Sequence, residues 1–110
     1  MVIYNKIFPF GNYVAINLFG IIFSKSKPLT DRTINHENIH TRQMIEMLFI
    51  FFYIWYGIEW LIRLIQYKNG HTAYRNISFE REAYYNELDY EYLNNRNKYR
   101  FLKYLSRHEQ

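Results

Sequence analysis

Twelve consecutive apolar residues, Met47–Ile58, dominate the middle of the sequence and are bracketed by Glu46 and Glu59. As a helix they cover about 18 Å, whereas the hydrocarbon of a membrane is about 30 Å thick. A longer span would have to include Glu59 and Arg63, which are spaced as i,i+4 partners on one helix face. The run therefore predicts a helix buried in the core of the protein or of a homo-oligomer, rather than one that crosses a membrane.

The same stretch carries aromatic residues that favour a membrane interface, namely Trp55, Tyr56 and Trp60. Residues 47–65 are therefore also a candidate for peripheral membrane contact. The first residues of the chain do not resemble a secretory signal, because Pro9 interrupts their apolar stretch and no small-residue cleavage site follows. We expect a cytoplasmic or membrane-associated protein.

Composition narrows the classes of function. The 110 residues contain no cysteine, which excludes disulfides and cysteine-ligated zinc. The net charge of +4 is spread along the chain, without a basic stripe or a glycine-rich loop. The basic, aromatic residues 96–107 are typical of an amphipathic helix that packs its apolar side inward. We therefore expect no nucleic-acid partner.

Pattern and length predict one domain of the α+β class, mainly helical, over residues 1–110. Residues 1–29 are rich in Ile, Val, Phe and Tyr and predict a short strand or hairpin within Tyr13–Ser24. Residues 30–67 predict helix, with Thr30 or Asp31 as the N-cap. Gly57 would mark a kink or a helix–helix contact, and residues 68–71 would form a loop.

Residues 76–106 predict two further helices. The first begins after Asn76 or Ser78, has acidic residues in its first turn and continues to about Asn94. The second is short and amphipathic and ends near Leu105. The spacing of apolar residues predicts that the buried face of the first helix consists of Phe79, Ala83, Asn86, Tyr90 and Leu93.

The sequence His36-Glu37-Asn38-Ile39-His40 is an H-E-x-x-H motif within the first predicted helix. His36 and His40 are one turn apart and project from the same face, so both imidazoles can bind one Zn²⁺. Glu37 can reach a metal-bound water as general base. The motif predicts a zinc site with two histidine ligands.

A third ligand has to come from another segment, and the acidic first turn of the helix after Ser78 offers two carboxylates. Glu80 and Glu82 point about 200° apart on a helix, so only one of them can face the metal. Periodicity leaves this choice open, since Glu82 lies nearer the centre of the predicted buried face. A solvated acidic turn, favoured by the helix dipole, is the alternative interpretation of both.

In the order of its motifs, the sequence resembles the gluzincin metallopeptidases, in which H-E-x-x-H is followed by a helix with a glutamate ligand. Glu80-Arg81-Glu82-Ala83 matches their E-x-x-A pattern, and the resemblance implies that Glu80 is the third ligand. Tyr84 stands where many gluzincins have an aspartate that supports a histidine ligand, which leaves that partner undefined. The resemblance covers these two motifs and their order, and it implies a strand or hairpin packed on a minimal zincin helical core.

The resemblance also implies roles for residues around the metal. Tyr74 or His71, just before the Glu80 helix, would stabilise the developing oxyanion, and Tyr74 is the stronger candidate. Gln43 extends the motif as H-E-x-x-H-x-x-Q, and it would orient a ligand or line the cleft, or else be an ordinary polar residue of the helix. Glu46 continues the same stripe, either as an acceptor for an imidazole N–H or as an exposed flank of the apolar run.

The predicted function is zinc-dependent hydrolysis of peptide bonds, with Glu37 as general base. The partner would be a peptide or protein substrate that pairs with an edge strand, for which Tyr13–Phe23 is the candidate segment. The alternatives are a zinc-binding protein without catalytic activity and a membrane-associated structural or interaction protein.

Overall fold

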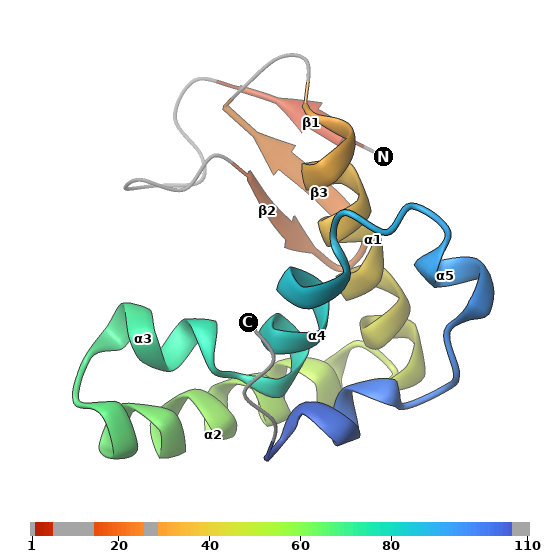
Figure 1. Ribbon diagram of the computed structural model, residues 1–110. Helices are drawn as coiled ribbons and strands as arrows, with labels where there is room; N and C mark the ends of the chain where they lie inside the picture. The colour runs from red at the N-terminus through yellow and green to blue at the C-terminus, as the bar shows by residue number, and fades with distance from the viewer. Residues whose placement is uncertain (1, 6–14, 26–28, 107–110) are drawn as a thin grey trace.

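A computed structural model describes residues 2–5, 15–25 and 29–106. The fold is α+β and mainly helical, which confirms the predicted class. A small sheet lies beside helix α1 (Asp31–Glu46), α4 (Ser78–Asn86) lies alongside α1, and α2 (Ile50–Tyr67) leaves from the C-terminal end of α1 (Figure 1). The remaining helices are α3 (Gly70–Arg75), α5 (Tyr92–Asn95) and the 3₁₀ helix η1 (Arg100–Tyr104).

The sheet contains three short strands in the order β1-β3-β2. Strands β2 (Ala15–Leu18) and β3 (Ile21–Ser24) form an antiparallel hairpin, and β1 (Val2–Tyr4) pairs with β3 in parallel. Asn17 of β2 ties the sheet to α1, because its amide donates to the Glu37 carbonyl at 2.8 Å. Strand β2 is thus an edge strand held against the motif helix. Tyr13, within the predicted strand region, lies outside the described residues.

The long helical region breaks at residues 47–49, not at Gly57 as the sequence suggested. Helix α1 begins at the Thr30 cap and ends at Glu46. Leu48 and Phe49 then adopt positive φ angles of 55° and 60°, which no helix can continue, and α2 leaves at 110° to α1. Gly57 lies within α2, and a Cβ at this position would come within 4 Å of no other helix or strand among the described residues.

Among the described residues, no single helix is long and apolar enough to cross a membrane; the bent pair α1–α2 meets that criterion only when its two helices are taken together.

Helix α4 ends at Asn86, eight residues earlier than predicted, because a distant side chain holds the following turn. The Asn35 amide of α1 donates to the carbonyls of Glu87 at 2.8 Å and Asp89 at 3.2 Å. Tyr90 is consequently exposed instead of continuing the buried face. The predicted loop at residues 68–71 also contains the first turn of α3, whose Thr72 N–H is capped by the Asn69 side chain at 2.9 Å.

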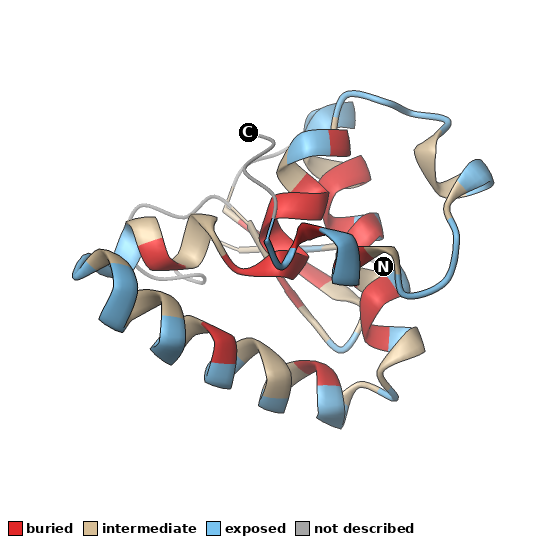
Figure 2. Cartoon of the chain, turned by 60° about the horizontal axis from the view of Figure 1, so that its bottom comes forward, coloured by how far each residue is buried: buried red, intermediate tan, exposed pale blue. Residues whose placement is uncertain are grey.

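Aromatic packing in the core fixes the position of α4 over α1 and α2. Phe79 of α4 is fully buried, with its ring 4.4 Å from the rings of both Phe52 and Phe101. Met44 and Ile77 complete this cluster. Because Phe79 immediately precedes Glu80, the cluster anchors the turn that carries the candidate third ligand. Figure 2 shows buried residues gathered where the central helices of the molecule face one another.

Candidate metal centre

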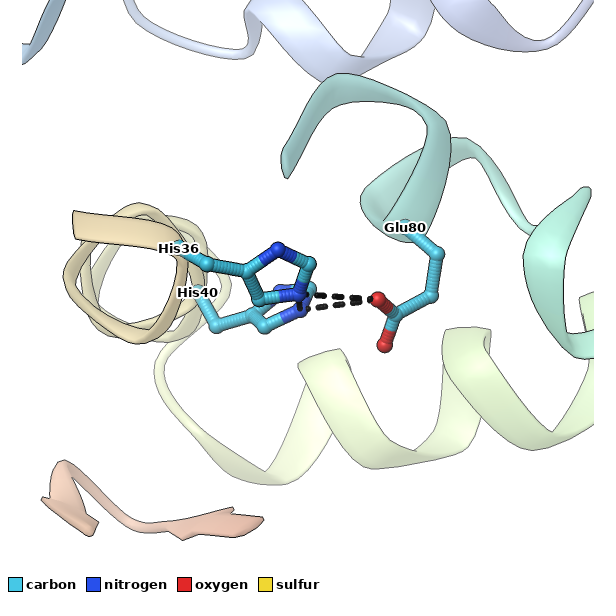
Figure 3. Close-up of side chains that lie close together, drawn as sticks. All are labelled: His36, His40 and Glu80. Atoms are coloured by element: carbon cyan, nitrogen blue, oxygen red, sulfur yellow. Dashed lines mark hydrogen bonds and ion pairs between the residues drawn. The ribbon is translucent and has the colours of Figure 1, made fainter. Parts of the chain in front are cut away.

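Two helices bring His36, His40 and Glu80 together in the interior (Figure 3). The Nε2 atoms of the two imidazoles are 3.2 Å apart. Oε1 of Glu80 lies 3.0 Å from Nε2 of His40 and 3.3 Å from Nε2 of His36. All three side chains are buried. The predicted ligand residues therefore meet at one point, and Glu80 rather than Glu82 is turned toward the imidazoles.

The spacing of these three atoms fits a tetrahedral zinc site. Ligand atoms at zinc–nitrogen and zinc–oxygen distances near 2.0–2.1 Å span a tetrahedral edge of ~3.3 Å. The three separations in the structure, 3.2, 3.0 and 3.3 Å, come close to that edge. A tetrahedral site with three protein ligands keeps a fourth position open, which is the arrangement of catalytic rather than structural zinc.

Hydrogen bonds on the far side of each ring fix the imidazole tautomers. Nδ1 of His36 lies 2.8 Å from the Glu87 carboxylate, which only accepts. Nδ1 of His40 lies 2.8 Å from Oε1 of Gln43, whose amide nitrogen donates to the Phe79 carbonyl and to Glu82. Both Nδ1 atoms therefore donate, so the Nε2 atom facing Glu80 carries a lone pair whenever its ring is neutral.

With both rings neutral, three acceptor atoms converge on one buried spot, which a bound cation can satisfy. In the metal-free protein that cation is the proton. Burial lowers the pKa of His36, but its hydrogen bonds with Glu80 and Glu87 outweigh burial and raise the pKa to about 9. Attraction to Glu80 likewise raises the pKa of His40 against burial. Burial raises the pKa of Glu80, but His40 and His36 outweigh it and leave this pKa well below its usual range.

Glu37 occupies the wall of a cleft that opens onto the three converging atoms. The cleft has a volume of about 290 Å³ and lies between β2, α1 and α2. Burial raises the pKa of the Glu37 carboxyl, although the two nearby histidines oppose the rise. A carboxylate with a raised pKa beside the site has the character of a general base. The predicted base thus lines the same cleft as the candidate ligands.

Two tyrosines line the cleft near Glu80, and a third contacts one of them from behind. Tyr56 of α2 donates its hydroxyl to Oε2 of Glu80 at 2.7 Å. Tyr74 lines the cleft, and its hydroxyl lies 2.8 Å from that of Tyr84. Burial raises the pKa of Tyr74, so its hydroxyl stays protonated and able to donate. His71, the other predicted oxyanion candidate, is exposed and is not part of the cleft wall.

The remaining predicted residues form a second layer behind the imidazoles. Gln43 is fully buried and orients His40. Glu82 points away from the metal cluster and pairs with Arg96, which also binds Glu46 at 2.8 Å. Glu46 therefore neither reaches an imidazole nor lies free on the surface. It is the outer end of a chain of polar contacts that runs from Gln43 through Glu82 and Arg96.

A carboxylate from α2 caps α4 and so positions Glu80. Glu59 accepts hydrogen bonds from the Ser78 N–H and hydroxyl, both at 2.6 Å. The residues at the start of α4 supply no side-chain cap of their own. The buried Glu59 thus occupies the position that favours a negative charge at a helix N-terminus.

The sequence did not point to Glu87 or Tyr56 as parts of the site. Glu87 follows the end of α4 and reaches His36 only because Asn35 fixes the turn around it. Tyr56 is one of twelve tyrosines, and nothing in its local sequence distinguishes it. The i+7 spacing of Glu87 from Glu80 is the one signal that could have suggested a second acid on the same helix face.

Comparisons of the chain with known protein families, with curated proteins and with solved structures found no match.

Proposed function

We propose that this chain is a zinc-dependent hydrolase that cleaves peptide bonds. The observation that carries the proposal is the convergence of two imidazole lone pairs and one carboxylate oxygen, at tetrahedral spacing, beside a cleft. A metal ion is the ligand that these acceptors suit, and histidine with carboxylate suits zinc. The sequence has no cysteine, so no thiolate competes for the site.

When bound, zinc lowers the pKa of a coordinated water to about 7. His36, His40 and Glu80 are the proposed ligands. Glu37 accepts the proton of the attacking water and delivers it to the leaving amine. Tyr74 donates its hydroxyl to the oxyanion that develops on the substrate carbonyl.

An extended peptide is the substrate shape that this cleft favours. Ala15, Ile16, Asn17 and Leu18 of β2 form one wall of the cleft. Strand β2 pairs only with β3 in the described sheet, so its other edge offers main-chain donors and acceptors to a peptide. Phe52 and Tyr53 add apolar surface for a side chain of the substrate.

Metal content and hydrolysis of a quenched fluorescent casein by purified protein test the proposal. We expect about one zinc per chain, as three protein ligands and a water require, with loss of zinc in His40→Ala. Glu37→Gln should keep the zinc and lose hydrolysis, because its amide accepts no proton. Asn38→Ala, an exposed neighbour within the motif, is the matched control and should keep both.

A wild-type protein without zinc, and unable to take it up, would refute the proposal. Zinc binding with no hydrolysis above that of Glu37→Gln would leave a zinc-binding protein without catalytic activity.

A further inference from the structure

The outward face of α2 is more apolar than its inward face, the reverse of an ordinary surface helix. Between Ile50 and Ile65 the outward side of the helix exposes no charged side chain. The carboxylate of Glu59 lies on the inward side and is buried. Figures 1 and 2 place this helix at one boundary of the molecule. The exposed members, here called the α2 outer face, are Ile50, Phe51, Ile54, Ile58, Leu61, Ile62 and Ile65, each at least 49% exposed.

The α2 outer face is continuous and narrow. At 100° per residue its seven side chains fall within an arc of about 120°, and they extend over about 22 Å of helix. At the α1–α2 bend, Ile45 and Leu48 add exposed apolar surface. Leu105 borders an apolar groove on the same helix, together with Ile54 and Ile58. A patch of this extent marks an interaction site.

The chemistry of the face favours lipid over protein as its occupant. Protein interfaces concentrate Tyr, Trp and Arg anchors and make about one hydrogen bond per 100–200 Å². The α2 outer face offers no hydroxyl, amide or guanidinium group, since its members are Ile and Leu with a single Phe. Aliphatic side chains without polar partners suit the acyl region beneath lipid headgroups.

The charges next to the face complement an anionic surface. Exposed cations stand at both ends, with Arg42 one turn before Ile45 and Lys68 directly after α2. The exposed acids among the described residues, Asp31, Asp89 and Glu91, lie on the first turn of α1 and before α5. Figures 1 and 2 both place these segments away from α2. Basic residues near an anionic leaflet contribute about 1 kcal/mol each.

We propose that the α2 outer face docks this protein on an anionic lipid surface, with α2 lying in the plane of the interface. The helix lies on the membrane and does not cross it, because its inward face is packed against the protein through Phe52, Glu59 and Tyr56. That inward face also borders the metal-site cleft. Docking therefore places the cleft about one helix diameter, ~10 Å, from the lipid headgroups.

Co-sedimentation with vesicles tests the proposal and does not depend on zinc. We expect the full chain to bind phosphatidylcholine–phosphatidylserine vesicles, and to bind phosphatidylcholine alone more weakly. Replacing Ile54 and Ile58 together by Glu should weaken binding by at least about tenfold, because charge enters the apolar face. The matched control replaces Tyr85 and Leu88, exposed apolar residues outside this face, by Glu and should bind like the wild type.

Unchanged vesicle binding by the Ile54→Glu, Ile58→Glu protein would overturn the proposal. A second result would also overturn it: the wild type forms a dimer without lipid, and the variant dissociates this dimer but binds vesicles as before. The α2 outer face would then join two copies of the chain. If the variant fails to fold by circular dichroism, quenching of tryptophan emission by brominated lipids decides the question with the wild type. Trp55 borders the groove on the α2 outer face, and an absence of quenching would overturn lipid docking.

Discussion

Gln43 holds the imidazole of His40 in the orientation and tautomer that the proposed zinc site requires. Its oxygen accepts from Nδ1 of His40, and its nitrogen donates to Glu82, so the amide cannot turn without losing both bonds. We expect Gln43→Ala to weaken zinc binding by about 10- to 100-fold, as loss of an outer-shell partner does. Competition with a fluorescent chelator measures this change.

Exposed Gln66 of α2 provides the matched control, and Gln66→Ala should bind zinc like the wild type. Equal zinc affinity in Gln43→Ala and the wild type would show that Gln43 has no part in orienting the ligand.

Protons compete with zinc for the two imidazoles. The pKa of His36 is raised to about 9, so this ring is largely protonated at pH 7 without metal, and the pKa of His40 is also raised, because burial is outweighed mainly by Glu80. Zinc needs the neutral rings, so its apparent affinity should rise with pH by up to about tenfold per unit for each proton displaced, and level off above pH 9. Calorimetric titration at pH 7 in buffers of different ionisation enthalpy should show proton release, and buffer-independent heats would contradict the assignment.

The sequence predicted those parts of the site that depend on helix periodicity alone. The H-E-x-x-H spacing places two imidazoles one turn apart wherever that segment is helical. Glu80 and Glu82 could not be separated in this way, because both are buried and differ only in what surrounds α4: the imidazoles on one side, Gln43 and Arg96 on the other. Tertiary packing made that choice.

At the scale of the elements, long-range contacts determine where helices begin and end. The bend between α1 and α2 rests on positive φ angles at Leu48 and Phe49, residue types that carry no signal for such a conformation. The end of α4 rests on Asn35, more than fifty residues earlier in the chain. The hairpin could be predicted, because strand alternation and Gly20, at a φ of 87°, are local features.

The Glu59 cap joins α2 to α4 and can be tested by stability. Glu59→Ala leaves the buried Ser78 N–H without its acceptor and Arg63 without its carboxylate partner. We expect the free energy of unfolding to fall by about 3 kcal/mol. Denaturant unfolding provides the measurement.

Ser78→Ala is the control, because it removes only the hydroxyl bond and should cost about 1 kcal/mol. A loss in Glu59→Ala no larger than that in Ser78→Ala would show that the cap contributes little.

For the whole molecule, zinc bound to the folded state alone adds stability by mass action. At a free zinc concentration one hundred times the dissociation constant, the gain is about 2.7 kcal/mol. For a domain of this size, addition of a chelator should therefore lower Tm by about 10 °C. His40→Ala should show no response to the chelator, whereas Glu82→Gln, although less stable, should respond like the wild type. Equal responses of His40→Ala and the wild type would contradict the proposed ligand set.

Because the side chain that caps α4 belongs to α2, the order in which the helices fold is constrained. The two imidazoles reside within one helix and can form a pair early, but the first turn of α4 gains its acceptor only when α2 has docked against it. Early folding states therefore present two histidines without the carboxylate that completes the set. With the proposed ligand set, high affinity for zinc would arise only at the last stage of folding, and metal capture would report that the helices have reached their native arrangement.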